Sequence, residues 1–181
     1  MTKPTTIRFK TPLLRPATPT GAKWSFLVLP VNASAKLPTR SMTTVEGTLN
    51  GQAFQATLEP DGQRSHWLKV SRALRAAAGA EVGDTVVLEV TLTAVEPEPT
   101  LPADLRKALS ANPAAKATWS DISPIARRDW IHWITSGKRA ETRDRRIATA
   151  CNMLASGKRR ACCCDRSGIY SKSFSAPEAA E

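Results

Sequence analysis

Basic side chains gather in residues 123–160, and they are the groups in this chain whose type and spacing best suit a chemical task. Guanidinium and ammonium groups on outward helix faces and at helix ends can bind phosphates and carboxylates. Nine side chains are candidates for such anion or partner contacts: Arg127, Arg128, Lys138, Arg139, Arg145, Arg146, Lys158, Arg159 and Arg160. The alternative stays open that this face is only solvated.

The charge of the chain favours an anionic partner. Its 181 residues carry a formal charge of +10, and residues 101–181 hold 15 basic and 8 acidic side chains. Nucleic acid, an acidic protein face or a lipid surface would each match this charge. Neither the partner nor the oligomeric state follows from charge alone.

The other reactive side chains form no catalytic or metal-binding pattern. Three consecutive cysteines cannot readily surround one tetrahedral ion, and the paired C-x-x-C spacing of zinc sites is absent: Cys162, Cys163 and Cys164. His66 and His132 complete no Ser/His/Asp or Cys/His set, and no glycine loop has phosphate-binding spacing. We therefore expect no enzyme activity, no catalytic residues, no cofactor and no metal site.

A first amphipathic helical pattern positions part of the basic set. On a wheel of about 100° per residue, one apolar stripe contains four residues: Ala126, Trp130, Trp133 and Ile134. His132 falls about 160° from Trp130 on the same wheel. The pattern predicts that His132 and Arg128 face solvent.

A second helical pattern begins near Thr142, a candidate N-cap, and ends at Gly157. Its apolar face contains Ile147, Ala150, Cys151 and Leu154, so Cys151 is predicted to be a core residue. Arg145 and Arg146 point away from that face. Arg143 lies one turn before Ile147, and we expect a carboxylate, either Asp129 or Glu141, to hold its guanidinium group.

The first part of the chain is rich in strand patterns. Residues 45–49 and 54–58 alternate apolar with polar or small side chains around Asn50–Gly51, a dipeptide suited to a type I′ turn. Residues 24–29 and 85–92 are predicted core strands, and Ser71 is predicted to cap one short helix that stops at Gly79. Short strands with one small helix indicate a small β-barrel.

The sequence thus predicts an α+β protein with four parts. A small β-barrel domain occupies residues 5–95, and a Pro/Glu linker occupies residues 96–100 because its prolines disfavour a strand. A small all-α domain spans residues 101–160, where Asn112 and Ser123 each precede a proline as N-caps. Residues 161–181 lack periodicity and are predicted to form a flexible tail.

The string SPIARRDWIHWITSGKRAETRDRRI resembles the C-terminal domain of the YdeI/OmpD-associated bacteriocin-protection family. The segments VEGTLNGQAF, SHWLKV and LRAAAGAEVGDTVVLEV are similar to the small β-barrel domain of unknown function that often precedes it, and together the two resemblances cover about residues 5–160. One departure is Ala140, where the pattern would have proline. The resemblance implies a bacterial cytosolic protein, not known as an enzyme, that is linked by family name to protection against bacteriocins and cationic peptides.

Three classes of function remain open. The favoured one is a non-enzymatic stress or interaction protein with a protein partner. A nucleic-acid-binding module that uses the two-helix face is the alternative, although the turn SGKRAE is long for a DNA-reading helix pair. The third class is an enzyme that binds a small molecule in the lumen of the β-barrel, and it would depend on His66. No run of about 18 apolar residues occurs, and the N-terminus lacks a signal-peptide pattern, so a cytoplasmic location is expected.

Overall fold

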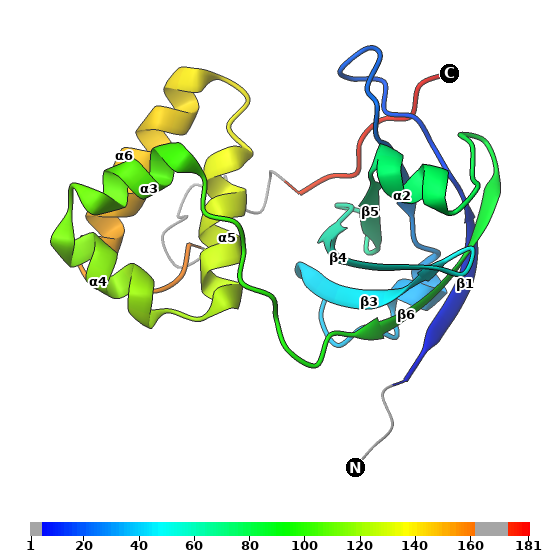
Figure 1. Cartoon of the computed structure of the whole chain (residues 1–181), viewed down its shortest axis with the longest axis horizontal. Helices are drawn as coiled ribbons and strands as arrows, with labels where there is room; N and C mark the ends of the chain where they lie inside the picture. The colour runs from blue at the N-terminus through cyan, green and yellow to red at the C-terminus, as the bar shows by residue number, and fades with distance from the viewer. Residues whose placement is uncertain (1–4, 162–173) are drawn as a thin grey trace. The chain divides into compact units, whose positions relative to one another are not determined.

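The protein is described by a computed structural model that covers residues 5–161 and 174–181. The chain divides into two compact units, drawn in Figure 1: a β unit of residues 1–94 and 174–181, and a helical unit of residues 95–173. Strands precede the longer helices along the chain, which confirms the predicted α+β class. The run of three cysteines lies outside the described residues: Cys162, Cys163 and Cys164.

The described part of the β unit contains six antiparallel strands: β1 (Ile7–Pro12), β2 (Ser25–Val28), β3 (Thr43–Leu49), β4 (Gln52–Pro60), β5 (His66–Val70) and β6 (Thr85–Leu92). They pair in the order β1-β6-β3-β4-β5-β2. Leu14, just beyond β1, exchanges two backbone hydrogen bonds of 2.7 and 2.9 Å with Phe26 of β2. The sheet therefore curls into the half-barrel visible in Figure 1, as the β-barrel prediction requires.

Local signals in the sequence explain several elements of this unit. Asn50 and Gly51 join β3 to β4 with φ angles of 47° and 84°, as a type I′ turn requires. Val86, Leu88 and Val90 alternate with less buried residues along β6 and enter the core. The predicted cap is also confirmed, because the Ser71 hydroxyl accepts the amide of Leu74 at 3.1 Å at the start of α2 (Arg72–Ala77).

Three features of this unit differ from the prediction. Strand β1 and the short helix α1 (Val31–Ser34) were not expected. Residues 174–181 are not a free tail: the amide of Ala17 donates to Glu178 O and the amide of Ala180 donates to Arg15 O, each at 2.8 Å. These backbone hydrogen bonds attach the C-terminal residues to the β unit.

The helical unit contains α3 (Ala103–Ser110), α4 (Pro113–Asp121), α5 (Pro124–Thr135) and α6 (Ala140–Ala155) among its described residues. Asn112 and Ser123 cap α4 and α5 as predicted, by accepting the amides of Ala115 and Ala126 at 3.1 and 3.3 Å. Helix α6 packs against the other three helices. It begins at Ala140 rather than near Thr142, because alanine favours a helix; its N-cap, Arg139, forms no side-chain cap hydrogen bond.

Apolar side chains from all four helices form the core of this unit. Leu105, Trp130, Ile134 and Leu154 are fully buried, and Cys151 packs among them, which confirms its prediction as a core residue. Burial raises the pKa of the Cys151 thiol, so its reactive thiolate form is disfavoured. In the described part of the chain, no helix is both long and apolar enough to cross a bilayer.

Candidate functional site

Arg127 connects the end of α4 to the start of α5. Its Nε donates to Trp119 O at 2.9 Å, and one terminal nitrogen donates to Ser120 O at 2.8 Å. The other terminal nitrogen contacts Glu98 Oε2 at 2.8 Å. Since these atoms accept from all three guanidinium nitrogens and use three of the five N–H donors, Arg127 stabilises the corner between two helices.

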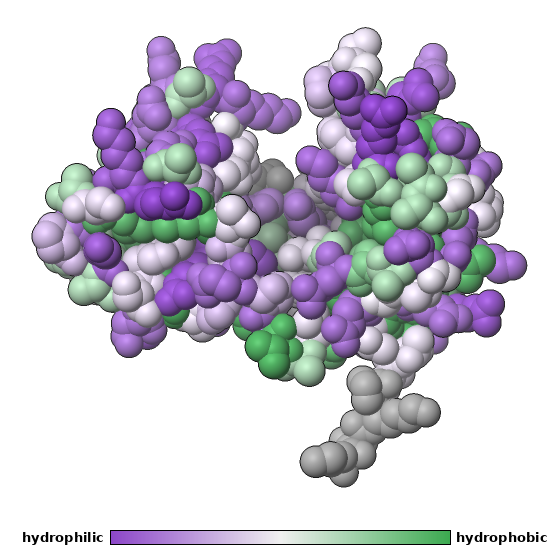
Figure 2. All heavy atoms as spheres, viewed as in Figure 1, coloured by the Kyte–Doolittle hydropathy of each residue, from purple (hydrophilic) through white to green (hydrophobic). Residues whose placement is uncertain are grey.

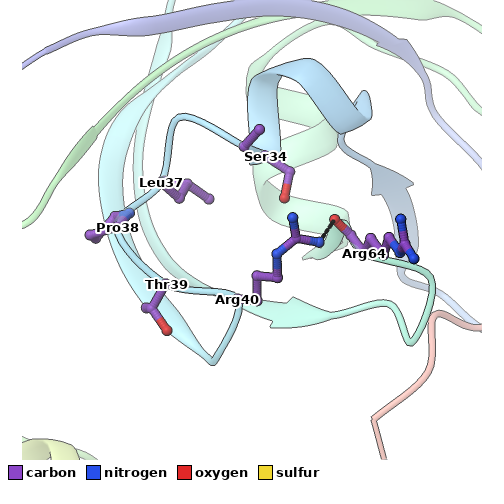
Figure 3. Close-up of a pocket in the computed structure, with 7 residues that line it drawn as sticks. Ser34, Leu37, Pro38, Thr39, Arg40 and Arg64 are labelled. Carbon is purple, nitrogen blue, oxygen red and sulfur yellow. Dashed lines mark hydrogen bonds between the residues drawn. The ribbon is translucent and has the colours of Figure 1, made fainter.

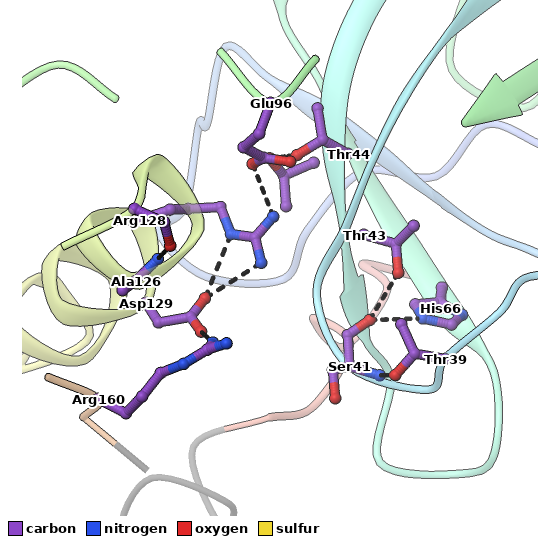
Figure 4. Close-up of polar contacts among 12 residues, drawn as sticks. Thr39, Ser41, Thr43, Thr44, His66, Glu96, Ala126, Arg128, Asp129 and Arg160 are labelled. Carbon is purple, nitrogen blue, oxygen red and sulfur yellow. Dashed lines mark hydrogen bonds and ion pairs between the residues drawn. The ribbon is translucent and has the colours of Figure 1, made fainter. Parts of the chain in front are cut away.

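Arg128 lies in a cluster of charged side chains, the Arg128 cluster, with Glu96, Asp129 and Arg160 (Figure 4). It contacts Glu96 Oε1 at 2.7 Å and Asp129 Oδ1 at 3.1 Å, while Arg160 approaches Asp129 Oδ2 at 3.5 Å. The side chains of Arg128, Glu96 and Asp129 are only 14%, 16% and 13% exposed. The prediction that Arg128 faces solvent is therefore wrong, because acidic groups cover that side of α5.

The pKa of Asp129 reports the balance of forces in this cluster. Burial raises it above the ordinary aspartate value, and the positive charge of Arg128 is the largest opposing effect. A carboxylate that is only 13% exposed is costly without a cation beside it. The Arg128 cluster is thus a structural ion network within the helical unit.

Arg146 and His132 also differ from their predicted outward positions. Arg146 donates to Trp133 O and to Ser136 Oγ at 2.5 and 2.8 Å, and its guanidinium carbon lies 5.5 Å from the centroid of the Trp133 ring. His132 is partly buried, and its pKa is lowered first by burial and then by the charges of Arg128 and Arg146. A helical wheel describes one helix alone, so it could not show that Arg146 of α6 packs against the end of α5.

Two further arginines are held by carboxylates from distant parts of the sequence. Arg143 forms a two-pronged pair with Asp104 of α3, not with Asp129 or Glu141 as expected. Arg159 contacts the carboxylate and the backbone oxygen of Asp121 at the end of α4. Of the nine predicted anion-binding residues, Arg127, Arg128, Arg146, Arg159 and Arg160 therefore make contacts within the helical unit.

The other four predicted residues, Lys138, Arg139, Arg145 and Lys158, are exposed and have no carboxylate partner among the described residues. Lys138 and Arg139 precede α6, Arg145 lies in its second turn, and these three are named the corner cations. The rise of a helix places Arg139 and Arg145 about 9 Å apart along its axis. Figure 2 shows hydrophilic side chains protruding where α5 connects to α6. Lys158 lies beyond the opposite end of α6.

The partially free amides at the start of α6 add positive potential beside the corner cations. The N-cap of α6, Arg139, makes no side-chain cap hydrogen bond, so it does not satisfy those amides. Glu141 in the first turn offsets part of this potential. The corner cations remain the part of the predicted site that is available to an anion.

His66 does not belong to a catalytic triad in the part of the chain that the structure describes. It is fully buried, and its Nδ1 and Nε2 lie 2.7 Å from Ser34 Oγ and 3.0 Å from Ser41 O. Both ring nitrogens are thus used within the β unit, and burial lowers the pKa of the imidazole. Within residues 5–161 and 174–181, no group of three His, Cys, Asp or Glu residues is arranged to hold a metal ion.

The partners of these arginines, Glu96, Glu98, Asp104 and Asp121, were not identified from the sequence. The two linker glutamates could have been recognised as possible partners of arginines, because they form an acidic segment before a strongly basic one. Asp104 and Asp121 carried none, since their spacing from Arg143 and Arg159 is 39 and 38 residues.

Comparison with known families agrees with this two-unit organisation. Residues 9–90 match the family described as domain of unknown function DUF1905, and residues 98–157 match the family described as Bacteriocin-protection, YdeI or OmpD-Associated. Neither is known as a family of enzymes. No curated protein matches the chain. The helical unit thus matches the YdeI or OmpD-associated bacteriocin-protection family and the β unit matches the DUF1905 family, in the order that the sequence resemblance predicted.

Proposed function

We propose that this chain is a non-enzymatic interaction protein whose helical unit binds an acidic face of a partner protein through the corner cations. The observation that carries the proposal is a contrast within the basic segment. Arg127, Arg128 and Arg146 are held by acceptors of their own unit, whereas the corner cations are exposed and have no carboxylate partner among the described residues. Complementary carboxylates on a partner would provide those contacts.

The sign of the charge limits how such a protein would take part in bacteriocin protection. A cationic peptide would be repelled by the corner cations, so direct capture of such a peptide by this surface is unfavourable. Protection would instead act through an anionic cellular protein that the chain engages. The family name supports only the general process.

Nucleic acid is a weaker partner for the same surface. Trp130 is fully buried and cannot stack on a base, and five of the nine arginines and lysines predicted to bind anions make contacts within the helical unit. Three corner cations would release few counterions, with a log–log salt slope of only about −2 on a single strand.

The proposal is tested by reversing the charge of the corner cations: Lys138→Glu, Arg139→Glu and Arg145→Glu. The matched control makes the same change in charge at exposed positions of the β unit: Lys10→Glu, Lys36→Glu and Arg72→Glu. Binding is measured against poly-glutamate and against a single-stranded oligonucleotide of equal charge. We expect the wild type and the control to bind poly-glutamate, and the corner variant to lose most of that binding.

A survival assay connects this binding to the process. A strain that lacks the gene is challenged with bacteriocins and cationic peptides after complementation with each variant. The corner variant should fail to restore survival, while the control should restore it. Equal rescue by both variants, or binding of the oligonucleotide without binding of poly-glutamate, would overturn the proposal.

A further inference from the structure

A hollow of about 240 Å³ opens in the β unit between the segment after α1 and the turn that joins β4 to β5 (Figure 3). Ser34, Thr39, Arg40 and Arg64 provide polar groups to its wall, and Leu37 and Pro38 provide apolar ones. This volume suits a small molecule or one functional group of a larger ligand. All the residues that line the hollow belong to the β unit, whereas the corner cations belong to the helical unit.

Both arginines of the hollow are exposed and have no ion-pair partner among the described residues. A terminal nitrogen of Arg40 donates to the backbone oxygen of Arg64 at 3.3 Å, and this contact holds Arg40 beside the turn. The acidic residue of the turn, Asp61, accepts the amides of Gln63 and Ser65 at 2.7 and 2.8 Å. Arg40 and Arg64 therefore both line the hollow without a carboxylate to offset their charge, and an anion that both side chains reach would be stabilised there.

The base of the hollow is held by the buried pair of Ser34 and His66. A carbonyl oxygen can only accept, so His66 Nε2 carries the proton that it donates to Ser41 O, and Nδ1 accepts the Ser34 hydroxyl proton. Burial lowers the pKa of His66, which favours the neutral form of the ring. The donors left to face a ligand are then chiefly the guanidinium groups of Arg40 and Arg64.

The backbone of Arg64 adds a second observation. Its φ angle is +73°, in the left-handed region where glycine or asparagine is less strained than arginine. Strained residues of this kind are concentrated at ligand-binding sites. An arginine at this position is not needed to make the turn, so its side chain is the feature to be explained.

We propose that this hollow binds the oxyanion group of a small ligand, a phosphate or a carboxylate, through the guanidinium groups of Arg40 and Arg64. Planar guanidinium groups match either oxyanion with paired hydrogen bonds. Phosphate and carboxylate share this chemistry, and a titration with each probe distinguishes them.

The probes are inorganic phosphate and acetate, each titrated at constant ionic strength against chloride and followed by amide chemical shifts. We expect saturable shifts confined to residues 34–40 and 61–66, with a dissociation constant on the order of millimolar for so small a probe. Saturation by phosphate alone identifies a phosphate site, and saturation by acetate alone identifies a carboxylate site. Saturation by both identifies a general oxyanion site.

Two variants test the assignment of residues. Arg64→Asn removes the charge yet keeps a residue that tolerates the left-handed backbone, and Arg40→Ala removes one exposed side chain. Each should weaken binding by on the order of tenfold, because each removes charge-assisted hydrogen bonds. Arg72→Ala, an exposed arginine of α2, is the matched control and should bind as the wild type does.

Three results would overturn the proposal: no saturable shift with either probe, shifts spread over the β unit, or an equal loss of affinity in the Arg72→Ala control. Amide spectra recorded without a probe show whether each variant is folded, so a loss of binding in a folded variant supports the proposal.

Discussion

Replacing Arg128 with methionine tests whether the Arg128 cluster holds the helical unit together. Methionine keeps much of the side-chain volume but removes the cation that contacts Glu96 and Asp129. Those carboxylates are 16% and 13% exposed, so water replaces the lost contacts poorly. Breaking a buried ion pair costs about 3–5 kcal/mol, and Arg160 still lies 3.5 Å from Asp129. We therefore expect a loss of about 2–3 kcal/mol in the free energy of unfolding.

Hydrogen exchange measured by mass spectrometry suits this prediction because it resolves the two units separately. Amides of α5 and α6 should lose protection in Arg128→Met, while those of β3 should not change. Arg145→Met is the matched control, since Arg145 is exposed on α6, and it should alter stability by less than about 0.5 kcal/mol. An equal effect of the two substitutions would refute the assignment of the Arg128 cluster as a structural network.

The pH dependence of the free energy of unfolding tests the same assignment independently. The pKa of Asp129 is raised by burial and lowered chiefly by Arg128, so the variant raises it further. A carboxyl whose pKa is higher in the folded state destabilises the fold above that pKa, and the penalty disappears as pH falls through it toward the unfolded value. The difference in the free energy of unfolding between the wild type and Arg128→Met should therefore be largest near neutral pH and should become smaller in acid. A difference that widens in acid would contradict this account.

Three further predictions concern other parts of the chain. Asp104→Asn should lower the free energy of unfolding by at most about 1 kcal/mol, because both Asp104 and its partner Arg143 are partly exposed. The hydrogen bond from Arg143 lowers the pKa of Asp104 in the folded state. Urea unfolding should therefore show this loss at a pH above the ordinary carboxyl pKa, and no loss at a pH below the folded pKa. Gly47→Ala should destabilise the β unit by about 3 kcal/mol or more in thermal unfolding, since its Cβ would overlap the backbone oxygen of Glu89 in the paired strand β6. Cys151 should resist iodoacetamide in the folded protein and react after denaturation, as followed by peptide mapping, because it is buried and its thiol pKa is raised.

The parts of the fold that could be predicted have signals within a few neighbouring residues. Asn50–Gly51 needs only its own backbone preferences, and Ser71 and Asn112 need only an amide three residues later. Helix α1 has four residues, too short for a periodic pattern. Residues 174–181 attach to the β unit through backbone hydrogen bonds such as that from Ala17 to Glu178, which leave no pattern in side-chain types.

The candidate site shows why residue type and helix position do not decide whether a cation is available. Arg128 and Arg145 both lie off the apolar stripe of their helices, and the helix patterns predict that both side chains are exposed. Glu96, 32 residues before Arg128, contacts its guanidinium, whereas Arg145 has no carboxylate partner among the described residues. The carboxylate oxygen of Glu96 that distinguishes the two arginines lies outside the helix, so a helical wheel cannot include it. Counting net charge therefore overstates a binding face unless nonlocal carboxylates are first assigned, and the charge-reversal experiment belongs at the corner cations rather than across the whole basic segment.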